Sequence, residues 1–250
     1  MCDNEGWVLN IPYVDSHCHL YEYDINDMVE YLKVLVIAAV SDDLESSIET
    51  LNLASKFNNI VPCIGIHPWE VSNTPRKYVK EVINLIGKYD VKCLGEIGLD
   101  RKFVPETIDR QREFFMEFLQ AAREYELTVN IHAVNTWSEV LELLRKYDIE
   151  KAVFHWYTGP IELVDEITYS GYFISINPAF TIQDKHRRII DYLDLEFLLT
   201  ESDGPYIYRG LKLNPLMVKE TVEYVSKVKK LSVEDVKKII YNNFRKLFTV

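Results

Sequence analysis

Five of the six histidines in this sequence lie at or just after short apolar segments, a position from which they could bind metal ions. His17 and His19 are separated by a single residue at the end of one such segment. Because successive side chains of a strand point to opposite faces, both imidazoles would point one way and Cys18 the other. Two imidazoles at this spacing can bind one ion, although the pair alone could also cap a core strand.

Isolated His, Glu and Asp residues follow other apolar segments in the same way. Imidazole ligands favour Zn, Mn, Co or Ni, whereas carboxylates add oxygen ligands that also accept Mg or Mn. A carboxylate from a middle strand can bridge two metals that lie about 3.5–4 Å apart. We therefore expect two divalent metal ions, either Zn, Mn or Mg, as the cofactor. The candidate residues are His17, His19, His67, Glu96, His132, His155 and Asp203.

Short apolar segments alternate with amphipathic ones, and these elements would position the candidate residues. Segments rich in Val, Ile and Leu with little polar alternation are typical of parallel strands buried on both faces. The segments between them have helical periodicity, the first with Asp42 as its cap and the last opening at Ser232 close to a capping box. The expected strands are 13–17, 33–40, 60–66, 91–97, 128–132, 151–155, 172–176 and 196–200, and the expected helices are 42–57, 107–125, 138–147, 161–169, 215–228 and one from 232.

This alternation over 250 residues predicts an α/β protein, a closed (β/α)8 TIM barrel that forms a single domain over residues 1–250. An open doubly wound sheet is the alternative, but it would need a Gly-rich phosphate turn after an early strand, and the sequence has none. In a barrel, residues that follow the strands meet at the C-terminal end, where barrel enzymes place their catalytic groups. The candidate residues should therefore converge on one cavity.

Composition and net charge indicate how the protein would interact with nucleic acid and membranes and in which redox state its cysteines would be. The net charge of −11 argues against a broadly basic nucleic-acid face, although bound cations and a local basic patch could reverse the sign where it matters. Cys2, Cys18, Cys63 and Cys93 form no Cys-x-x-Cys pair, and we expect them to be reduced and structural. The most apolar segment, 34–40, is too short to cross a membrane, and the N-terminal residues lack the features of a secretory signal. We expect a cytoplasmic monomer with no obligate protein partner.

Seven short motifs together resemble the TatD family of metal-dependent deoxyribonucleases, a branch of the amidohydrolase-type barrels. They occur in family order across nearly the whole chain, as DSHCHL at 15–20, GIHP at 65–68, GEIGLD at 95–100, IH at 131–132, HWYTG at 155–159, ESDGPY at 201–206 and NFRKLF at 243–248. The resemblance implies that His17, His19 and Asp203 bind the first ion. It also implies that His132 and His155 bind the second ion and that Glu96 bridges the two.

The resemblance further implies a reaction, the cleavage of phosphodiester bonds by a hydroxide activated by two metals, in a deoxyribonuclease of the 3′→5′ exonuclease type. Glu96 and Asp203 would be the catalytic residues, with Asp203 accepting the proton of the water. His67 would contact phosphate or orient the water. Arg101 and Lys102 are further candidate substrate contacts, and Glu201 would orient the metal-binding residues. DNA or another phosphodiester is the expected partner.

Two alternatives stay open. The sequence departs from the family pattern at 101–102, 132–137 and 212–215, which concern substrate contacts and not metal ligands. The same barrel could therefore hydrolyse a small ester, lactone or amide. A metal-bound scaffold without turnover is the second alternative, and the complete ligand set argues against it.

Basic and aromatic residues near the expected strand ends are further candidates for nucleic-acid contacts. The cluster at 185–188 could bind a phosphate backbone, or it could be an ordinary solvated helix face. Aromatic side chains that follow the strands could stack on bases or simply pack over the barrel. They are Trp69, Trp137, Trp156, Tyr157, Tyr206 and Tyr208.

Overall fold

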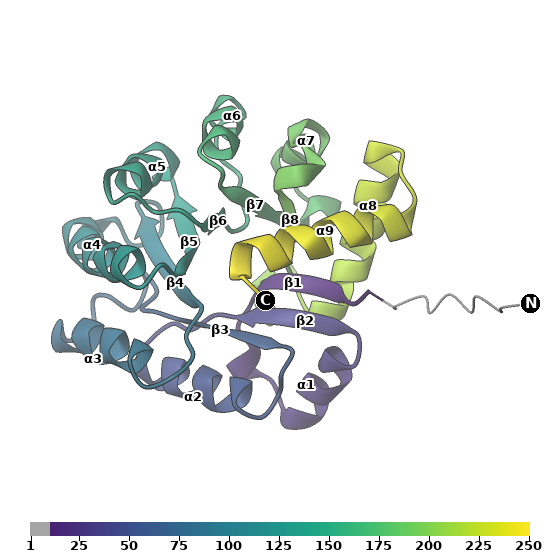
Figure 1. Ribbon diagram of the computed structural model, residues 1–250. Coiled ribbons are helices and arrows are strands. Elements are labelled where there is room, and N and C mark those ends of the chain that lie inside the picture. Colours follow the sequence, from purple (N-terminus) through teal and green to yellow (C-terminus); the bar gives the residue numbers. More distant parts are fainter. Residues whose placement is uncertain (1–10) are drawn as a thin grey trace, which may run out of the picture.

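Eight parallel strands form the inner wall of this protein, described here by a computed structural model over residues 11–250 (Figure 1). Each strand pairs in parallel with the next one along the chain, from β1 to β8. The strands are β1 (Tyr13–Cys18), β2 (Leu35–Ala39), β3 (Ile60–Ile64), β4 (Cys93–Asp100), β5 (Thr128–Val134), β6 (Ala152–Phe154), β7 (Phe173–Ile176) and β8 (Leu198–Thr200). All eight fall within or overlap the segments predicted from the sequence.

The segment after β8 returns to β1 and nearly closes the barrel. The backbone N–H of Ser202 donates to Oδ1 of Asp15 at 2.9 Å, and the N–H of Asp203 donates to the carbonyl of His17 at 2.9 Å. The predicted single (β/α)8 barrel is therefore confirmed. Because these bonds involve His17 and Asp203 themselves, the closure of the barrel also places two candidate site residues side by side.

Most of the helices surround the strands on the outside of the barrel, and the last helix runs across one end of it (Figure 1). They are α1 (Ile25–Leu32), α2 (Leu44–Ala54), α3 (Lys77–Ile86), α4 (Ile108–Glu124), α5 (Trp137–Lys146), α6 (Glu162–Tyr169), α7 (Asp184–Tyr192), α8 (Val218–Lys229) and α9 (Val233–Phe248). Helices α1, α3 and α7 were not among the predicted segments. A short hairpin, β9 (Ile207–Tyr208) with β10 (Leu211–Lys212), follows β8. Within residues 11–250, no helix is both long and apolar enough to span a membrane.

The first residue of α2 shows one error in the sequence-based prediction. The N-cap is Asp43, whose carboxylate accepts from the backbone N–H of Ser46 at 2.8 Å, and not Asp42. The Asp42 carboxylate instead accepts a 2.6 Å hydrogen bond from the Tyr21 hydroxyl and lies 3.3 Å from Nδ1 of His19. Through-space partners therefore decide which of two adjacent aspartates caps the helix.

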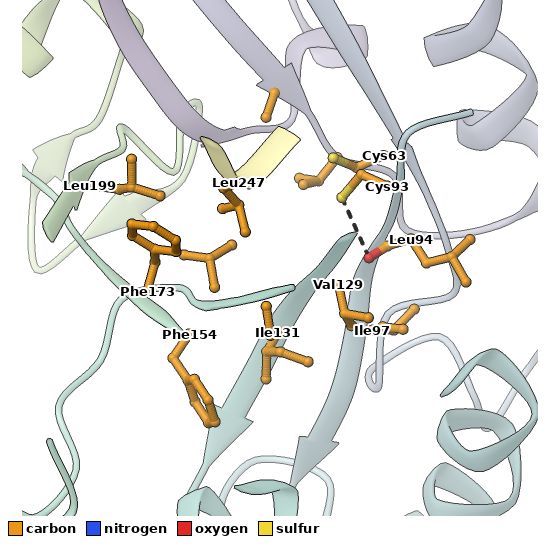
Figure 2. Close-up of a cluster of buried hydrophobic side chains, with 14 of the residues drawn as sticks. Cys63, Cys93, Leu94, Ile97, Val129, Ile131, Phe154, Phe173, Leu199 and Leu247 are labelled. Atoms are coloured by element: carbon orange, nitrogen blue, oxygen red, sulfur yellow. Dashed lines mark hydrogen bonds between the residues drawn. The ribbon is translucent and has the colours of Figure 1, made fainter. Parts of the chain in front are cut away.

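Apolar side chains fill the interior between the strands. Figure 2 shows Ile131, Phe154, Phe173 and Leu199 of the strands gathered around Leu247 of α9, and all five are buried. Helix α9 begins at the predicted cap Ser232, whose side chain accepts from the backbone N–H of Asp235. The described cysteines, Cys18, Cys63 and Cys93, are free and buried as predicted, whereas Cys2 and the rest of residues 1–10 lie outside the described residues.

Candidate active site

A cavity of about 340 Å³ opens where the barrel strands end. The residues that line it come from the segments after nearly every strand, so distant parts of the sequence contribute to one site. Among the predicted site residues, the lining includes His19, His67, Glu96, Lys102, His132, His155 and Asp203. His17 is completely buried and lies against the Glu96 and Asp203 carboxylates.

One oxygen of the Glu96 carboxylate faces three histidines from the middle of the barrel. Oε1 of Glu96 lies 2.5 Å from Nδ1 of His132 and 2.8 Å from Nε2 of His155. Nε2 of His67 lies 3.2 Å from the same oxygen. At 3.2 Å, His67 is farther from Glu96 than His132 and His155 are. Its distance nevertheless lies between those of His17 and His19 to the same carboxylate, 3.1 and 3.4 Å.

The other oxygen of Glu96 faces the residues at the barrel seam. Oε2 lies 3.1 Å from Nε2 of His17 and 3.4 Å from Nε2 of His19. Oδ1 of Asp203 lies 3.4 Å and 3.6 Å from the same two nitrogens. Glu96 thus stands between two groups of nitrogen and oxygen atoms, each near one of its oxygens.

The backbone at Asp203 helps to direct its carboxylate into the cavity. Asp203 has a φ of 54°, a left-handed conformation that is uncommon for residues other than glycine. Its N–H donates to the carbonyl of His17, so the hydrogen bonds of the seam hold this conformation in place. Strained conformations of this kind are concentrated at functional sites.

Several buried nitrogens of the site have no hydrogen-bond partner among the described residues. They include Nε2 of His17, Nδ1 of His19 and Nδ1 of His155. Nε2 of His17 lies close to two carboxylates, yet neither pair has the geometry of a hydrogen bond. Since an unpaired buried polar atom is costly, and His, Asp and Glu are ordinary ligands of divalent metals, this donor set fits bound metal ions.

Opposite charges shift the pKa values of these groups strongly. Burial alone would raise the pKa of Glu96, but the surrounding imidazoles, His155 first, hold it well below its ordinary value. Burial alone would lower the pKa of His17, but Glu96 and Asp203 raise it well above the ordinary value. The pKa of His132 rises to about 9 through Asp100 and Glu96, against the effect of burial. Bound divalent ions would compensate the same negative charge without protons on the imidazoles.

Hydrogen bonds from outside the cavity orient the histidines. Nδ1 of His17 lies 2.8 Å from Oδ1 of Asn130, an acceptor, so Nδ1 carries the proton and Nε2 presents its lone pair to the cavity. Nε2 of His132 lies 3.1 Å from Oδ2 of Asp100, which leaves Nδ1 facing Glu96. Carboxylate or carbonyl partners of this kind are typical of metal-binding histidines.

Asn130 and Asp42 also belong to the site but are not among the residues predicted for it, although the sequence holds a signal for each. Asn130 precedes His132 by two residues, so both lie on the same face of β5. Asp42 follows a predicted strand in the same way as the other site residues. Both positions could have been found by asking which polar residues share a face or a strand end with a candidate ligand.

Glu201 lies behind the cavity and connects several of the surrounding segments. Its carboxylate accepts from the backbone N–H of Trp156 at 2.8 Å and from the Ser175 hydroxyl at 2.5 Å. Trp156 has a φ of 39°, so this bond holds an uncommon backbone conformation directly after His155. Nδ1 of His155 lies 3.8 Å from Glu201, which places Glu201 beside the histidine rather than in the cavity.

The two basic residues predicted to contact substrate lie in different places. Lys102 lines the cavity. The Arg101 guanidinium is paired with Glu139 of α5 at 2.6 Å, and Arg101 is not among the residues that line the cavity. Of the two residues, Lys102 is therefore the one placed to contact a ligand in the cavity.

Only some of the other residues predicted to contact nucleic acid line the cavity or are exposed to a ligand. Of the six aromatic residues predicted to contact bases, four line the cavity, namely Trp69, Trp156, Tyr206 and Tyr208. The other two, Trp137 and Tyr157, pack against each other. In the basic cluster 185–188, His186 is buried and Arg187 is paired with Asp184. Only the exposed Lys185 and Arg188 of that cluster remain available to a ligand.

Comparison with known proteins shows what this chain is similar to. The family model described as TatD related DNase matches residues 14–249. An uncharacterised metal-dependent hydrolase of Methanocaldococcus jannaschii is 34% identical over 250 residues, which covers 96% of this chain and 98% of the relative. Deoxyribonuclease TATDN3 of Homo sapiens is 28% identical over 261 residues and covers 94% of each chain.

Solved structures agree with this result at the level of the fold. The TatD homologue YJJV of Escherichia coli K12 superposes with a TM-score of 0.88 at 22% identity, covering 97% of this chain and all of the other. A TatD family hydrolase of Entamoeba histolytica superposes with a TM-score of 0.82 at 20% identity, covering 95% of this chain and 98% of the other. The similarity thus extends over nearly the entire barrel.

Proposed function

This chain belongs to the TatD family of metal-dependent hydrolases, and we propose on that premise that it is a deoxyribonuclease of the 3′→5′ exonuclease type. The observation that carries the proposal is the position of Glu96, with a separate group of ligand atoms at each carboxylate oxygen. We also propose that residues 1–250 act as one hydrolase unit. The family match over residues 14–249 supports this.

The donor set suits two divalent ions, Zn, Mn or Mg. His17, His19 and Asp203 would hold one ion, His132 and His155 would hold the other, and Glu96 would contact both. When bound, the ions would act as Lewis acids that lower the pKa of a water molecule and offset negative charge on the phosphate.

The side chains of the cavity would carry out the remaining tasks. Asp203 would accept the proton of the attacking water, because its carboxylate lines the cavity beside His17 and His19 and so lies next to the proposed position of the water. His67 would orient that water or contact the phosphate, since Nε2 lies within 3.2 Å of Glu96. Lys102, at the cavity rim, would attract the negatively charged substrate.

A nuclease assay with a variant of Glu96 tests this function. Purified protein should contain about two divalent metals per chain by elemental analysis. It should release mononucleotides from the 3′ end of single-stranded DNA with Mn²⁺ or Mg²⁺. Glu96→Ala should reduce the rate by about 10³-fold or more, because loss of the shared ligand removes several kcal/mol of charge stabilisation. Glu49→Ala, an exposed position on α2, is the matched control and should leave the rate unchanged.

One observation favours a second candidate, a hydrolase of a small ester, lactone or amide. Apart from the histidines, Lys102 is the one cation among the lining residues described. Besides Glu96 and Asp203, three acidic side chains line the same cavity, Glu22, Asp42 and Glu70. A cavity of about 340 Å³ is also large enough for a small molecule. Turnover of a lactone or acyl-ester panel, with DNA left intact under the same metal conditions, would replace the nuclease proposal. Full metal content without turnover of either class would indicate a scaffold.

A further inference from the structure

Resting on the proposed nuclease function, we propose that one side of the cavity mouth binds the nucleotides next to the scissile phosphate of single-stranded DNA. This aromatic–cation surface consists of the lining residues Lys102 and Phe103 at one end and Trp156, Tyr206 and Tyr208 at the other. It also includes Arg209, which is not a lining residue but lies over the Tyr208 ring. The bases would stack on the aromatic rings, and the flanking phosphates would contact Lys102 and Arg209.

The charge of the lining residues differs around the mouth. The acidic residues Glu22, Asp42 and Glu70 lie in the segments after β1, β2 and β3. The segments after β4 to β8 contribute no acidic residue to the lining other than Asp203, which belongs to the ligand group at Glu96. A polyanion is repelled from the first side and accepted on the second, so the strand should lie along the segments after β4 to β8.

At each end of the aromatic–cation surface, a cation lies over an aromatic ring. Nζ of Lys102 lies 4.5 Å from the centre of the Phe103 ring, and Cζ of Arg209 lies 5.3 Å from the centre of the Tyr208 ring. Among residues 11–250, neither cation forms an ion pair, in contrast to Arg101 with Glu139. Both cations are exposed and are therefore available to phosphate.

The second end of this surface is held in a defined geometry. Nε1 of Trp156 donates to Oε1 of Gln183 at 3.1 Å, and Nε2 of Gln183 donates to the Tyr208 hydroxyl at 3.2 Å. Rings of Tyr206 and Tyr208 pack edge-to-face against Trp156, with centroid distances of 6.0 and 5.0 Å. The hairpin turn that follows includes Arg209 and Gly210, both with positive φ. Stacking on rings that are already fixed costs little conformational entropy, which suits binding without sequence preference.

The hairpin also provides a control. Tyr208 pairs with Leu211 and Ile207 pairs with Lys212 across β9 and β10, so Lys212 lies on the opposite face of the hairpin from Tyr208. Lys212 belongs to the segment 212–215, which the family resemblance associates with substrate contacts, but its place on the opposite face keeps it out of the proposed surface. It is exposed, and its removal changes the net charge as much as the removal of Arg209 does. If the proposed surface binds DNA, removal of Arg209 should weaken binding and removal of Lys212 should not, whereas unspecific electrostatic attraction would make the two losses equal.

The test measures binding of a fluorescein-labelled single-stranded oligonucleotide protected by phosphorothioate linkages, followed by anisotropy at a fixed salt concentration. We expect Tyr208→Leu and Arg209→Ala each to weaken binding about 10-fold, while Tyr208→Phe and Lys212→Ala bind within about twofold of the wild type. An oligonucleotide with abasic sites at the positions next to the 3′ end should also bind about 10-fold more weakly.

Equal losses for Arg209→Ala and Lys212→Ala would overturn the proposal, because they would indicate unspecific electrostatic attraction. Unchanged binding of Tyr208→Leu or of the abasic oligonucleotide would also overturn it, because stacking would then be absent. Circular dichroism of each variant shows whether the barrel is intact. Since the linkages resist cleavage, failure of this binding pattern is distinguishable from failure of the nuclease assay.

Discussion

His19 illustrates how a single side chain is prepared for metal binding. Its Nε2 faces Glu96 and Asp203, while Nδ1 lies 3.3 Å from Oδ2 of Asp42. The Asp42 carboxylate is ionised, because His19 lowers its pKa to about 2 although burial would raise it. This contact lacks hydrogen-bond geometry, but a carboxylate so close to the ring increases the basicity of the nitrogen that would bind the metal.

At this scale we predict that Asp42→Asn weakens metal binding about 10- to 100-fold at the ion held by His17 and His19. The substitution keeps the size of the side chain but removes its charge, so the ring loses its anionic partner. Competitive titration against a chromogenic chelator measures the dissociation constant without reference to activity. Glu45→Gln, exposed on α2, is the control. Two metal affinities equal to those of the wild type would show that Asp42 does not support His19.

Strands β4 and β5 carry the centre of the site, and a glycine determines how closely they approach. Gly98 pairs with His132 across the two strands and has a φ of 153°. A Cβ at Gly98 would lie 1.9 Å from the carbonyl oxygen of His132. The contact is with backbone, which cannot move aside as a flexible side chain could, so Gly98 is required for the position of His132 relative to Glu96.

We predict that Gly98→Ala lowers the free energy of unfolding by about 3 kcal/mol, because it adds steric overlap to an unfavourable backbone conformation. Chemical unfolding followed by circular dichroism measures the loss. Gly87→Ala is the matched control, since Gly87 has a φ of −74° and no atom within 4 Å of the added Cβ. That variant should be unchanged or more stable by a few tenths of a kcal/mol. Equal stability of the two variants would refute the steric argument.

In the whole molecule, the residues of the apolar interior and the residues of the active-site cavity lie in different regions. Apolar side chains fill the inside of the barrel and contact α9 (Figure 2). Glu96, Asp203 and four histidines instead line the cavity where the strands end. Among residues 11–250, His186 is the one histidine that does not lie against the Glu96 carboxylate. It is buried, Nδ1 donates to the Tyr157 carbonyl at 3.3 Å, and Nε2 accepts from the N–H of Asn177 at 2.9 Å. These bonds connect α7 to the segments after β6 and β7.

The stability of the molecule should therefore depend on pH through His186. Burial lowers the pKa of His186 from 6.5 to about 4, so the folded state binds fewer protons than the unfolded state between these values. The contribution of the neutral histidine is complete above pH 6.5 and is lost as the pH falls toward 4, by about 3 kcal/mol in total.

Unfolding of the wild type and of His186→Gln at pH 7.5 and pH 5 measures this contribution. Glutamine can make both hydrogen bonds but does not titrate. From pH 7.5 to pH 5 the wild type should lose about 2 kcal/mol more stability than the variant. The shared titration of the cavity residues cancels in this comparison. Parallel losses in the two proteins would show that His186 is not protonated on unfolding.

The sequence by itself determined the barrel and the set of residues at its mouth. Apolar segments that alternate with amphipathic helices can bury both faces of a parallel sheet only in a few arrangements, and a chain of this length without a phosphate-binding turn favours the closed one. Once the strands are parallel, every residue that follows a strand lies at the same end. His17, Glu96, His132 and Asp203 therefore meet although up to 186 residues separate them, the separation of His17 and Asp203 (203 − 17).

Only the tertiary structure decided which way individual side chains point. Asp42 faces His19 because Tyr21 and His19 hold its carboxylate, and Arg101 turns away because Glu139 of α5 pairs with it. Asn130 became part of the site through its contact with His17, which lies 113 residues earlier. The local sequence determines the periodicity and the ends of helices and strands. The orientation of a side chain depends on the residues that it contacts, and these can lie far away in the chain.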